Sequence, residues 1–192
     1  MTRLSRILIG AVLGVGLGWF AAAGQARASV TVLGSNFAHD CFVAAKYGGP
    51  NGYGLEICSR SIDNEALDRR DLAGTFVNRG VIYMEQGAFK SAEHDFNRAL
   101  ALLPNLGEAV VNLGGAMIGE HRYAEGVAQI TRGLALSPEE PEKAFYNRAL
   151  GYEGLDDMKS AYFDYLKASQ IKPGWGPAKT ELTRFTVTQK AP

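Results

Sequence analysis

The sequence predicts an all-α solenoid of repeated helix pairs, and two observations support this. Pro104, Pro138 and Pro173 are spaced 34 and 35 residues apart, and each follows an apolar segment with helical character. Proline lacks the backbone donor, so it ends a helix at regular intervals here. A glycine- and proline-rich breaker at 48–52 also separates two further helical segments, Asn36–Tyr47 and Tyr53–Asn64. A period of this length predicts helix pairs that stack on one continuous core.

The stretches that end near these prolines align as repeats at 73–106, 107–140 and 141–175. Small residues recur where two helices of a pair would touch, and aromatic residues recur where successive pairs would touch. In the first repeat the recurring positions are Phe76, Gly80, Tyr83, Ala92, Phe96, Ala99 and Pro104. This pattern resembles the tetratricopeptide-repeat family, whose unit is a 34-residue helix pair. Arg79 departs from it, because the family usually has leucine there.

The resemblance implies an all-α right-handed superhelix, with further elements at both ends of the three clear repeats. A degenerate helix pair is expected within 29–72, and a capping helix over 178–185 is expected within the C-terminal segment 176–192. Repeat arrays need such caps because a terminal unit has no neighbour to cover it. We find no convincing strand in the sequence.

Residues 1–28 have the features of a signal peptide. Arg3 and Arg6 precede 17 uncharged residues at 7–23, and Ala26-Arg27-Ala28 supplies the small-x-small pattern that a signal peptidase reads. We expect cleavage after Ala28 and an exported protein of the bacterial cell envelope, in the periplasm. The alternative is an uncleaved membrane anchor, for which about 20 apolar residues are needed.

Cys41 and Cys58 are expected to form a disulfide. Carrying the repeat frame backwards places them at the positions of Arg79 and Phe96, which face the partner helix within a unit. Two cysteines in an exported chain also favour a disulfide. A metal site that includes His39 is the competing interpretation, but a Cys-x16-Cys spacing fits no usual zinc arrangement.

Composition and motifs point away from nucleic acid and from catalysis. The chain has 192 residues with 20 basic and 20 acidic side chains, so its net charge gives no reason to expect a nucleic acid partner. No glycine-rich phosphate loop follows a strand, and no histidine has a nucleophile or acid at a relay spacing. We therefore expect no enzyme, cofactor or metal.

In similar proteins the first helices of successive repeats line a concave groove that holds a peptide or a partner's helix. The resemblance implies that the groove positions here are Val77, Asn78, Val81, Met84, Val111, Asn112, Ile118, Tyr146, Asn147 and Leu150. Their apolar members would form an exposed stripe, covered in part by residues 29–36 or by self-association.

Asn78, Asn112 and Asn147 recur at one position of every repeat. An asparagine amide offers a donor and an acceptor, so these residues could bond the backbone of a bound peptide. The other interpretation, which we favour at this stage, is a contact within the repeat. The expected function is a protein-binding scaffold or adaptor for a protein or peptide partner. The alternatives are an auxiliary subunit of an envelope enzyme or transport complex, and a membrane-tethered scaffold.

Overall fold

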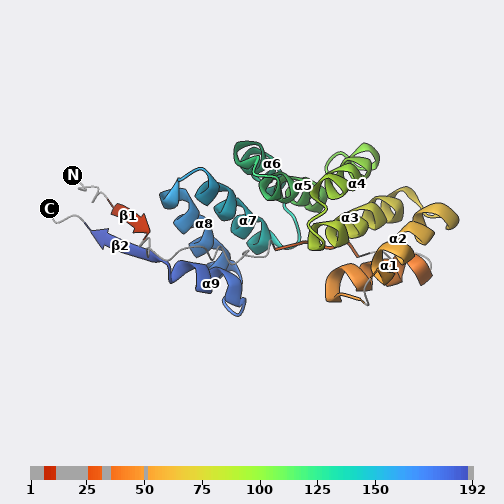
Figure 1. Ribbon diagram of the computed structural model, residues 1–192, viewed down its shortest axis with the longest axis horizontal. Coiled ribbons are helices and arrows are strands. Elements are labelled where there is room, and N and C mark those ends of the chain that lie inside the picture. Colours follow the sequence, from red (N-terminus) through yellow and green to blue (C-terminus); the bar gives the residue numbers. More distant parts are fainter. Residues whose placement is uncertain (1–6, 12–25, 32–35, 50–51, 190–192) are drawn as a thin grey trace.

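The computed structural model describes residues 7–11, 26–31, 36–49 and 52–189. Helix pairs stack side by side in a row that runs from the N-terminal pair to the C-terminal cap (Figure 1), and the predicted all-α superhelix is confirmed. The helices are α1 (Asn36–Tyr47), α2 (Tyr53–Asn64), α3 (Arg69–Glu85), α4 (Phe89–Leu102), α5 (Gly107–Gly119), α6 (Tyr123–Ala135), α7 (Pro141–Gly154), α8 (Met158–Ile171) and α9 (Gly176–Leu182).

Small residues let the two helices of each repeat pack closely. A Cβ added to Gly80 of α3 would lie 2.5 Å from the Phe96 ring of α4. In the next repeat, a Cβ on Gly114 would lie 2.8 Å from the carbonyl oxygen of Gly126. The third repeat has alanine at the equivalent place, Ala149, which is fully buried. Volume changes at such contacts are poorly tolerated, which explains the small residues of the repeat pattern.

Arg79 departs from the leucine of the repeat pattern because it forms a buried ion pair. Its Nε donates to Oδ2 of Asp95 at 2.7 Å and its Nη2 donates to Oδ1 at 2.9 Å. Asp95 is 1% exposed, and its hydrogen bonds raise the pKa of the Arg79 guanidinium. Arg148 and Asp164 repeat this geometry between α7 and α8, with the same two distances. Two repeats thus share a charged cross-link between their paired helices.

The N-terminal helix pair carries the disulfide that the sequence predicts. Cys41 of α1 and Cys58 of α2 are bonded, with a Cα–Cα distance of 4.8 Å, and both are fully buried. The two helices begin and end at the residues expected from the sequence. The bond joins the helices on either side of the glycine-rich turn and closes a loop of 17 residues.

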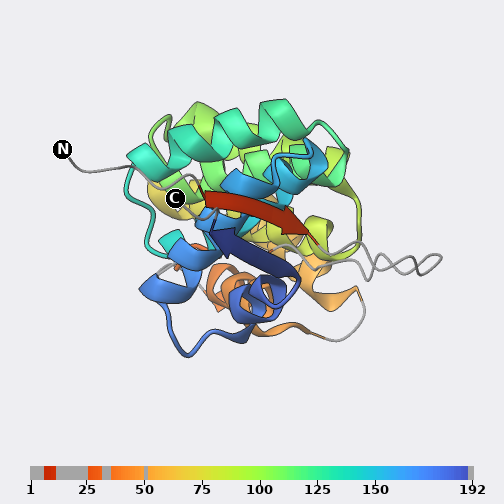
Figure 2. The ribbon, with the colours of Figure 1, turned by 90° about the vertical axis from the view of Figure 1, so that its left-hand side faces the viewer.

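The C-terminal end differs from the sequence prediction. Helix α9 ends at Leu182, and Phe185 begins a strand, β2 (Phe185–Gln189). β2 pairs in antiparallel fashion with β1 (Ile7–Ala11), with Ile7 opposite Gln189 and Ala11 opposite Phe185. Figure 2 shows the two strands together in front of the helices. The expectation that the sequence holds no strand was therefore wrong, since β1 comes from the apolar N-terminal stretch and gains a partner only in the folded chain.

The rest of that apolar stretch, residues 12–23, lies outside the described residues. The prediction of a cleaved leader and its alternative, a membrane anchor, therefore stay untested. Among the helices that the structure describes, none is both long and apolar enough to cross a membrane.

Candidate functional site

The asparagines at one position of each repeat lie on the first helices of the three pairs. Asn78 belongs to α3, Asn112 to α5 and Asn147 to α7, and all three are fully buried. Amide groups buried in this way require hydrogen-bond partners, because an unpaired buried amide costs about 1–3 kcal/mol.

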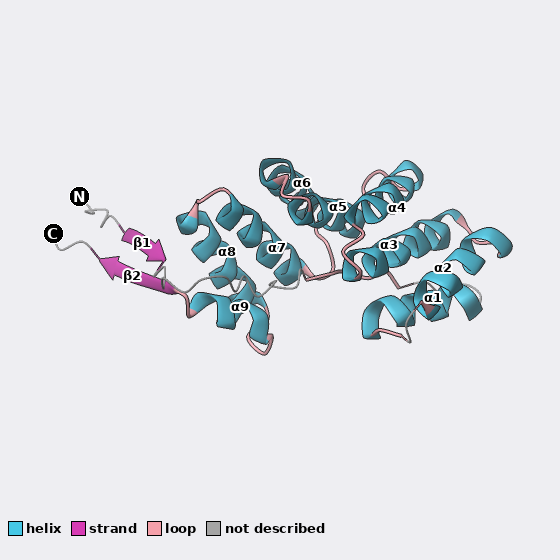
Figure 3. Cartoon of the chain, viewed as in Figure 1, coloured by secondary structure: helices cyan, strands magenta, loops and turns pink. Residues whose placement is uncertain are grey.

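Their partner is the chain's own segment 26–31, which belongs to no helix or strand and crosses α7, α5 and α3 (Figure 1 and Figure 3). Each asparagine accepts a hydrogen bond from the backbone N–H of one residue and donates one to the C=O of the same residue. The N–H and C=O bonds measure 2.9 and 2.5 Å for Asn147 with Ala26, 3.3 and 2.7 Å for Asn112 with Ala28, and 2.8 and 2.8 Å for Asn78 with Val30.

The alternation of bound residues follows from the geometry of an extended chain. The N–H and C=O of one residue point to the same side, and those of the next residue point to the opposite side. Each asparagine carboxamide therefore makes the two hydrogen bonds that a residue of a neighbouring β-strand would make. The three carboxamides together bond alternate residues of the segment as the edge of a β-sheet would. Our preference for a contact within the repeat was wrong, because these asparagines bind a peptide backbone.

Side chains add contacts to this main-chain recognition. Ala28 is only 2% exposed, Ala26 packs against the core of the third repeat and Val30 against that of the first. Arg27 forms an ion pair with Glu85, the last residue of α3, at 2.6 Å between Nη1 and Oε1. The Arg27 carbonyl oxygen accepts a hydrogen bond of 2.6 Å from Nζ of Lys143, in the first turn of α7.

Glu85 and Lys143 were missed by the sequence analysis. The signal that could have found them is a charged residue in the last or first turn of a helix that carries one of the recurring asparagines. We name as the groove the surface formed by Asn78, Glu85, Asn112, Lys143 and Asn147 together with the segment 26–31 that fills it.

The apolar residues predicted for the groove are covered in the full chain, and Val30, within the expected covering segment 29–36, packs against the cluster that holds Val77 and Val81. Val77, Val81 and Met84 are buried in the core of the first repeat, and Leu150 is half-buried. Val111 lies against Gly133 of α6, and Ile118 against Gly126 of α6 and Gly151 of α7. Val77 and Val111 each directly precede an asparagine, and one residue turns the side chain by about 100° around the helix, away from the asparagine's face.

Tyr146 also faces the core and not an open groove. Its ring packs against Tyr165 of α8 and Trp175, with centroid distances of 5.4 and 5.3 Å. Its hydroxyl donates to Glu181 of α9 at 3.4 Å, and burial raises its pKa, so it remains a neutral donor. Tyr146 therefore ties the third repeat to the C-terminal cap.

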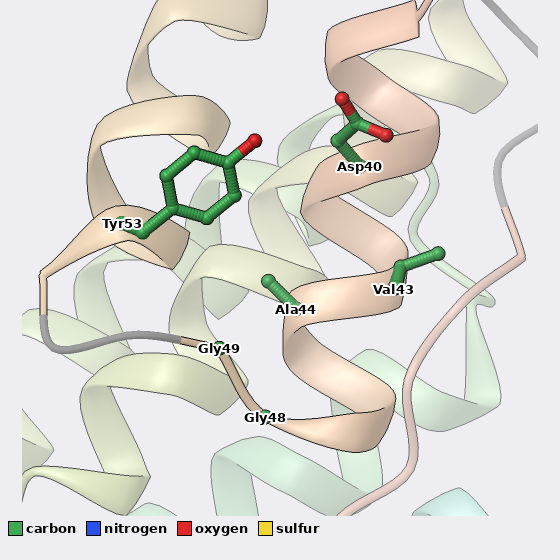
Figure 4. Close-up of a pocket in the computed structure, with 6 residues that line it drawn as sticks. All are labelled: Asp40, Val43, Ala44, Gly48, Gly49 and Tyr53. Carbon is green, nitrogen blue, oxygen red and sulfur yellow. The ribbon is translucent and has the colours of Figure 1, made fainter.

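Two hollows adjoin the described helices. A cleft of about 760 Å³ continues the groove past Thr31, between Asp68 before α3, the loop after α4 and Glu139. A smaller hollow of about 280 Å³ lies at the turn between α1 and α2, and it is lined by Asp40, Val43, Ala44, Gly48, Gly49 and Tyr53 (Figure 4). Neither hollow contains a histidine or a cysteine, and no cluster of metal-binding side chains occurs within the described ranges.

Comparisons with known proteins agree with this geometry. A family model described as "Tetratricopeptide repeat" matches residues 73–106. Among curated protein sequences none matches the chain. Among solved structures, that of MamA is similar at 19% identity over 78% of this chain and 82% of that chain, with a TM-score of 0.58. The Arabidopsis OM64 TPR domain is similar at 17% identity over 61% of this chain and 96% of that domain, with a TM-score of 0.56.

A third similar structure is the first TPR of Spaghetti (RPAP3) bound to the HSP90 peptide SRMEEVD. It shows 21% identity over 58% of this chain and 87% of that chain, with a TM-score of 0.53. At such identities the likeness shows the fold alone, and the match at 73–106 identifies one repeat by sequence. The chain thus has the fold of a tetratricopeptide-repeat solenoid.

Proposed function

We propose that this chain is a non-enzymatic peptide-binding module, exported to the bacterial cell envelope, that holds an extended segment of a partner protein in its groove. One observation carries the proposal: three asparagines, one per repeat, each bind both backbone groups of alternate residues in an extended segment. Main-chain hydrogen bonds of this kind give affinity for any extended peptide, whereas flanking pockets select among peptides. The similar Spaghetti domain bound to an HSP90 peptide supports a peptide partner.

The proposed leader gives the groove two states. Cleavage after Ala28 would remove Ala26, Arg27 and Ala28, so Asn147 and Asn112 would lose the backbone groups that they bind. Asn78 would keep Val30. The released chain would then present two amides that have lost their bonded backbone groups, and a partner's backbone could bond both. If the leader stays uncleaved, the segment stays docked and the chain is a tethered scaffold with a filled groove.

A direct test uses the peptide Gln-Ala-Arg-Ala, which copies residues 25–28 that the cleavage would remove, with a fluorophore on its N-terminal end and an amide at its C-terminal end. The chain is purified from the envelope of a bacterium that makes the full sequence, and mass spectrometry reads its N-terminus. We expect a mass that begins at Ser29 and saturable peptide binding measured by fluorescence anisotropy.

The matched variants are Asn112→Leu with Asn147→Leu, against Asn97→Leu as control. The double variant removes four hydrogen bonds of about 0.5–1 kcal/mol each, so binding is expected to weaken about 30- to 900-fold. Asn97 is exposed on α4 and its replacement is expected to leave binding unchanged. Equal affinity of all three proteins would refute main-chain recognition, and a product that retains 26–28 would refute the cleavage.

A further inference from the structure

Beyond main-chain recognition, we infer that the groove selects its ligand by side chain and prefers an extended peptide in which a small residue follows a basic one. The inference rests on the proposed function, because it takes the docked residues 26–28 as a stand-in for the ligand. The ligand's N-terminal end lies at α7 and its C-terminal end at α5, as for Ala26 at Asn147 and Ala28 at Asn112.

The basic residue is selected by Glu85. The Arg27 guanidinium lies 2.6 Å from the Glu85 carboxylate, and the two side chains are 26% and 35% exposed. Nε of Arg27 is buried and, within the described part of the chain, has no hydrogen-bond partner. Lysine carries a methylene at that place, so the site accepts either basic residue and the ion pair supplies the selectivity.

The small residue is selected by space. Ala28 is 2% exposed while both of its backbone groups bond Asn112, so its side chain points into packed surroundings and not into water. A larger side chain at this place must displace its neighbours or pull the backbone away from the asparagine. Thr31, four residues after Arg27, is exposed and carries no such restriction.

Lys143 does not favour an acidic ligand side chain in place of Arg27. Its Nζ donates to the backbone carbonyl of Arg27 and to Glu140 at 2.7 Å, so its charge is already matched by a carboxylate of the protein. An acidic ligand side chain at the Arg27 place would therefore meet Glu85 without gaining a free cation from Lys143. The charges on both sides of the peptide favour a basic residue.

Hydrogen exchange of the segment's amides in the full chain tests the inference. The chain is made by cell-free synthesis without membranes, so that residues 1–28 are kept, and protection is compared with the intrinsic exchange rate of each sequence. We expect Arg27→Glu and Glu85→Arg each to lower the protection about fivefold, since the ion pair is half-exposed and partly screened. The combined variant restores it to within about twofold, and Arg27→Lys keeps it. Ala28→Leu lowers it at least about tenfold, whereas Thr31→Leu does not.

The outcomes separate the inference from the proposed function. Exchange in α3 to α8 must match that of the parent chain, which shows that each variant is folded. Single charge reversals without effect, or a combined variant no better than the singles, would overturn the preference for a basic residue. Equal protection in Ala28→Leu and Thr31→Leu would overturn the preference for a small one. If Asn112→Leu with Asn147→Leu also leaves the segment protected, main-chain recognition itself fails.

Discussion

Replacing the buried ion pair of the first repeat tests how the helices of a repeat are held together. Asp95 is 1% exposed and its carboxylate is bound only through the Arg79 guanidinium among the hydrogen bonds found for it. Arg79→Leu leaves this carboxylate buried and unpaired, for which the usual loss is 3–5 kcal/mol. Because 17% of the Arg79 side chain is exposed, water reaches the site and we expect about 3 kcal/mol.

The second repeat supplies the matched control. Its equivalent residues are Leu113 and Gln129, so the double variant Arg79→Leu, Asp95→Gln copies a pair that the chain already uses. Replacing both members of a buried ion pair by well-packed residues is often neutral. We therefore expect the double variant to lose about 1 kcal/mol or less, so the coupling between the two sites is at least about 2 kcal/mol.

Urea unfolding followed by circular dichroism at 222 nm measures these free energies in the four proteins of the cycle. The loss is expected as a shift of the unfolding midpoint without a change of slope. A loss below about 1 kcal/mol for Arg79→Leu alone would refute the reasoning, and so would a double variant whose loss equals the sum of the singles.

Three further changes test other parts of the fold. Gly114→Ala is expected to destabilise the chain by about 1–3 kcal/mol, because its Cβ would lie 2.8 Å from a backbone oxygen of α6, whereas Gly176→Ala, with open space around it, should be neutral in the same urea assay. Cys58→Ser should lower stability by about 3 kcal/mol, and a reducing agent should lower the melting midpoint of the parent but not of this variant; identical parental midpoints in both conditions would contradict it. Asp157→Ala removes the N-cap of α8 and should lose about 1 kcal/mol at pH 7. Hydrogen bonds from Ser160 lower the pKa of Asp157. The stability that the ionised carboxylate adds is therefore present above the ordinary pKa of about 4 and is lost as the pH falls through the lower folded value. The difference in stability between parent and variant should therefore shrink in strong acid.

The sequence predicted the repeats because their rules are local. Proline spacing marks where second helices end, small residues mark close helix contacts, and the frame extended backwards places Cys41 beside Cys58. The same frame found the three asparagines, whose position on the first helix decides which way they point. These features depend on helical geometry alone, so no knowledge of the distant chain was needed.

Residues 29–36 were expected to cover part of the groove, and Val30 lies there. Residues 26–28 could not be predicted as occupants, because the asparagine amides bind backbone groups, which every sequence has. Arg27 belongs to the small-x-small pattern of a leader, and nothing in that pattern points to Glu85. The strand pair failed for a related reason, since β1 and β2 lie at opposite ends of the sequence. Val111 and Asn112 are neighbours in the sequence that face different sides of α5, because Val111 lies against Gly133 of α6 whereas Asn112 binds Ala28.

The most direct test of the central claim observes the side-chain amides of the asparagines themselves. A nitrogen-15 spectrum of the envelope-purified chain is recorded while unlabelled Gln-Ala-Arg-Ala, the copy of residues 25–28, is added. The account predicts saturable shifts of the side-chain NH₂ signals of Asn112 and Asn147, with the signal of Asn97 unchanged. Peptide binding that leaves the Asn112 and Asn147 signals in place would contradict it, because the peptide would then be held by another surface.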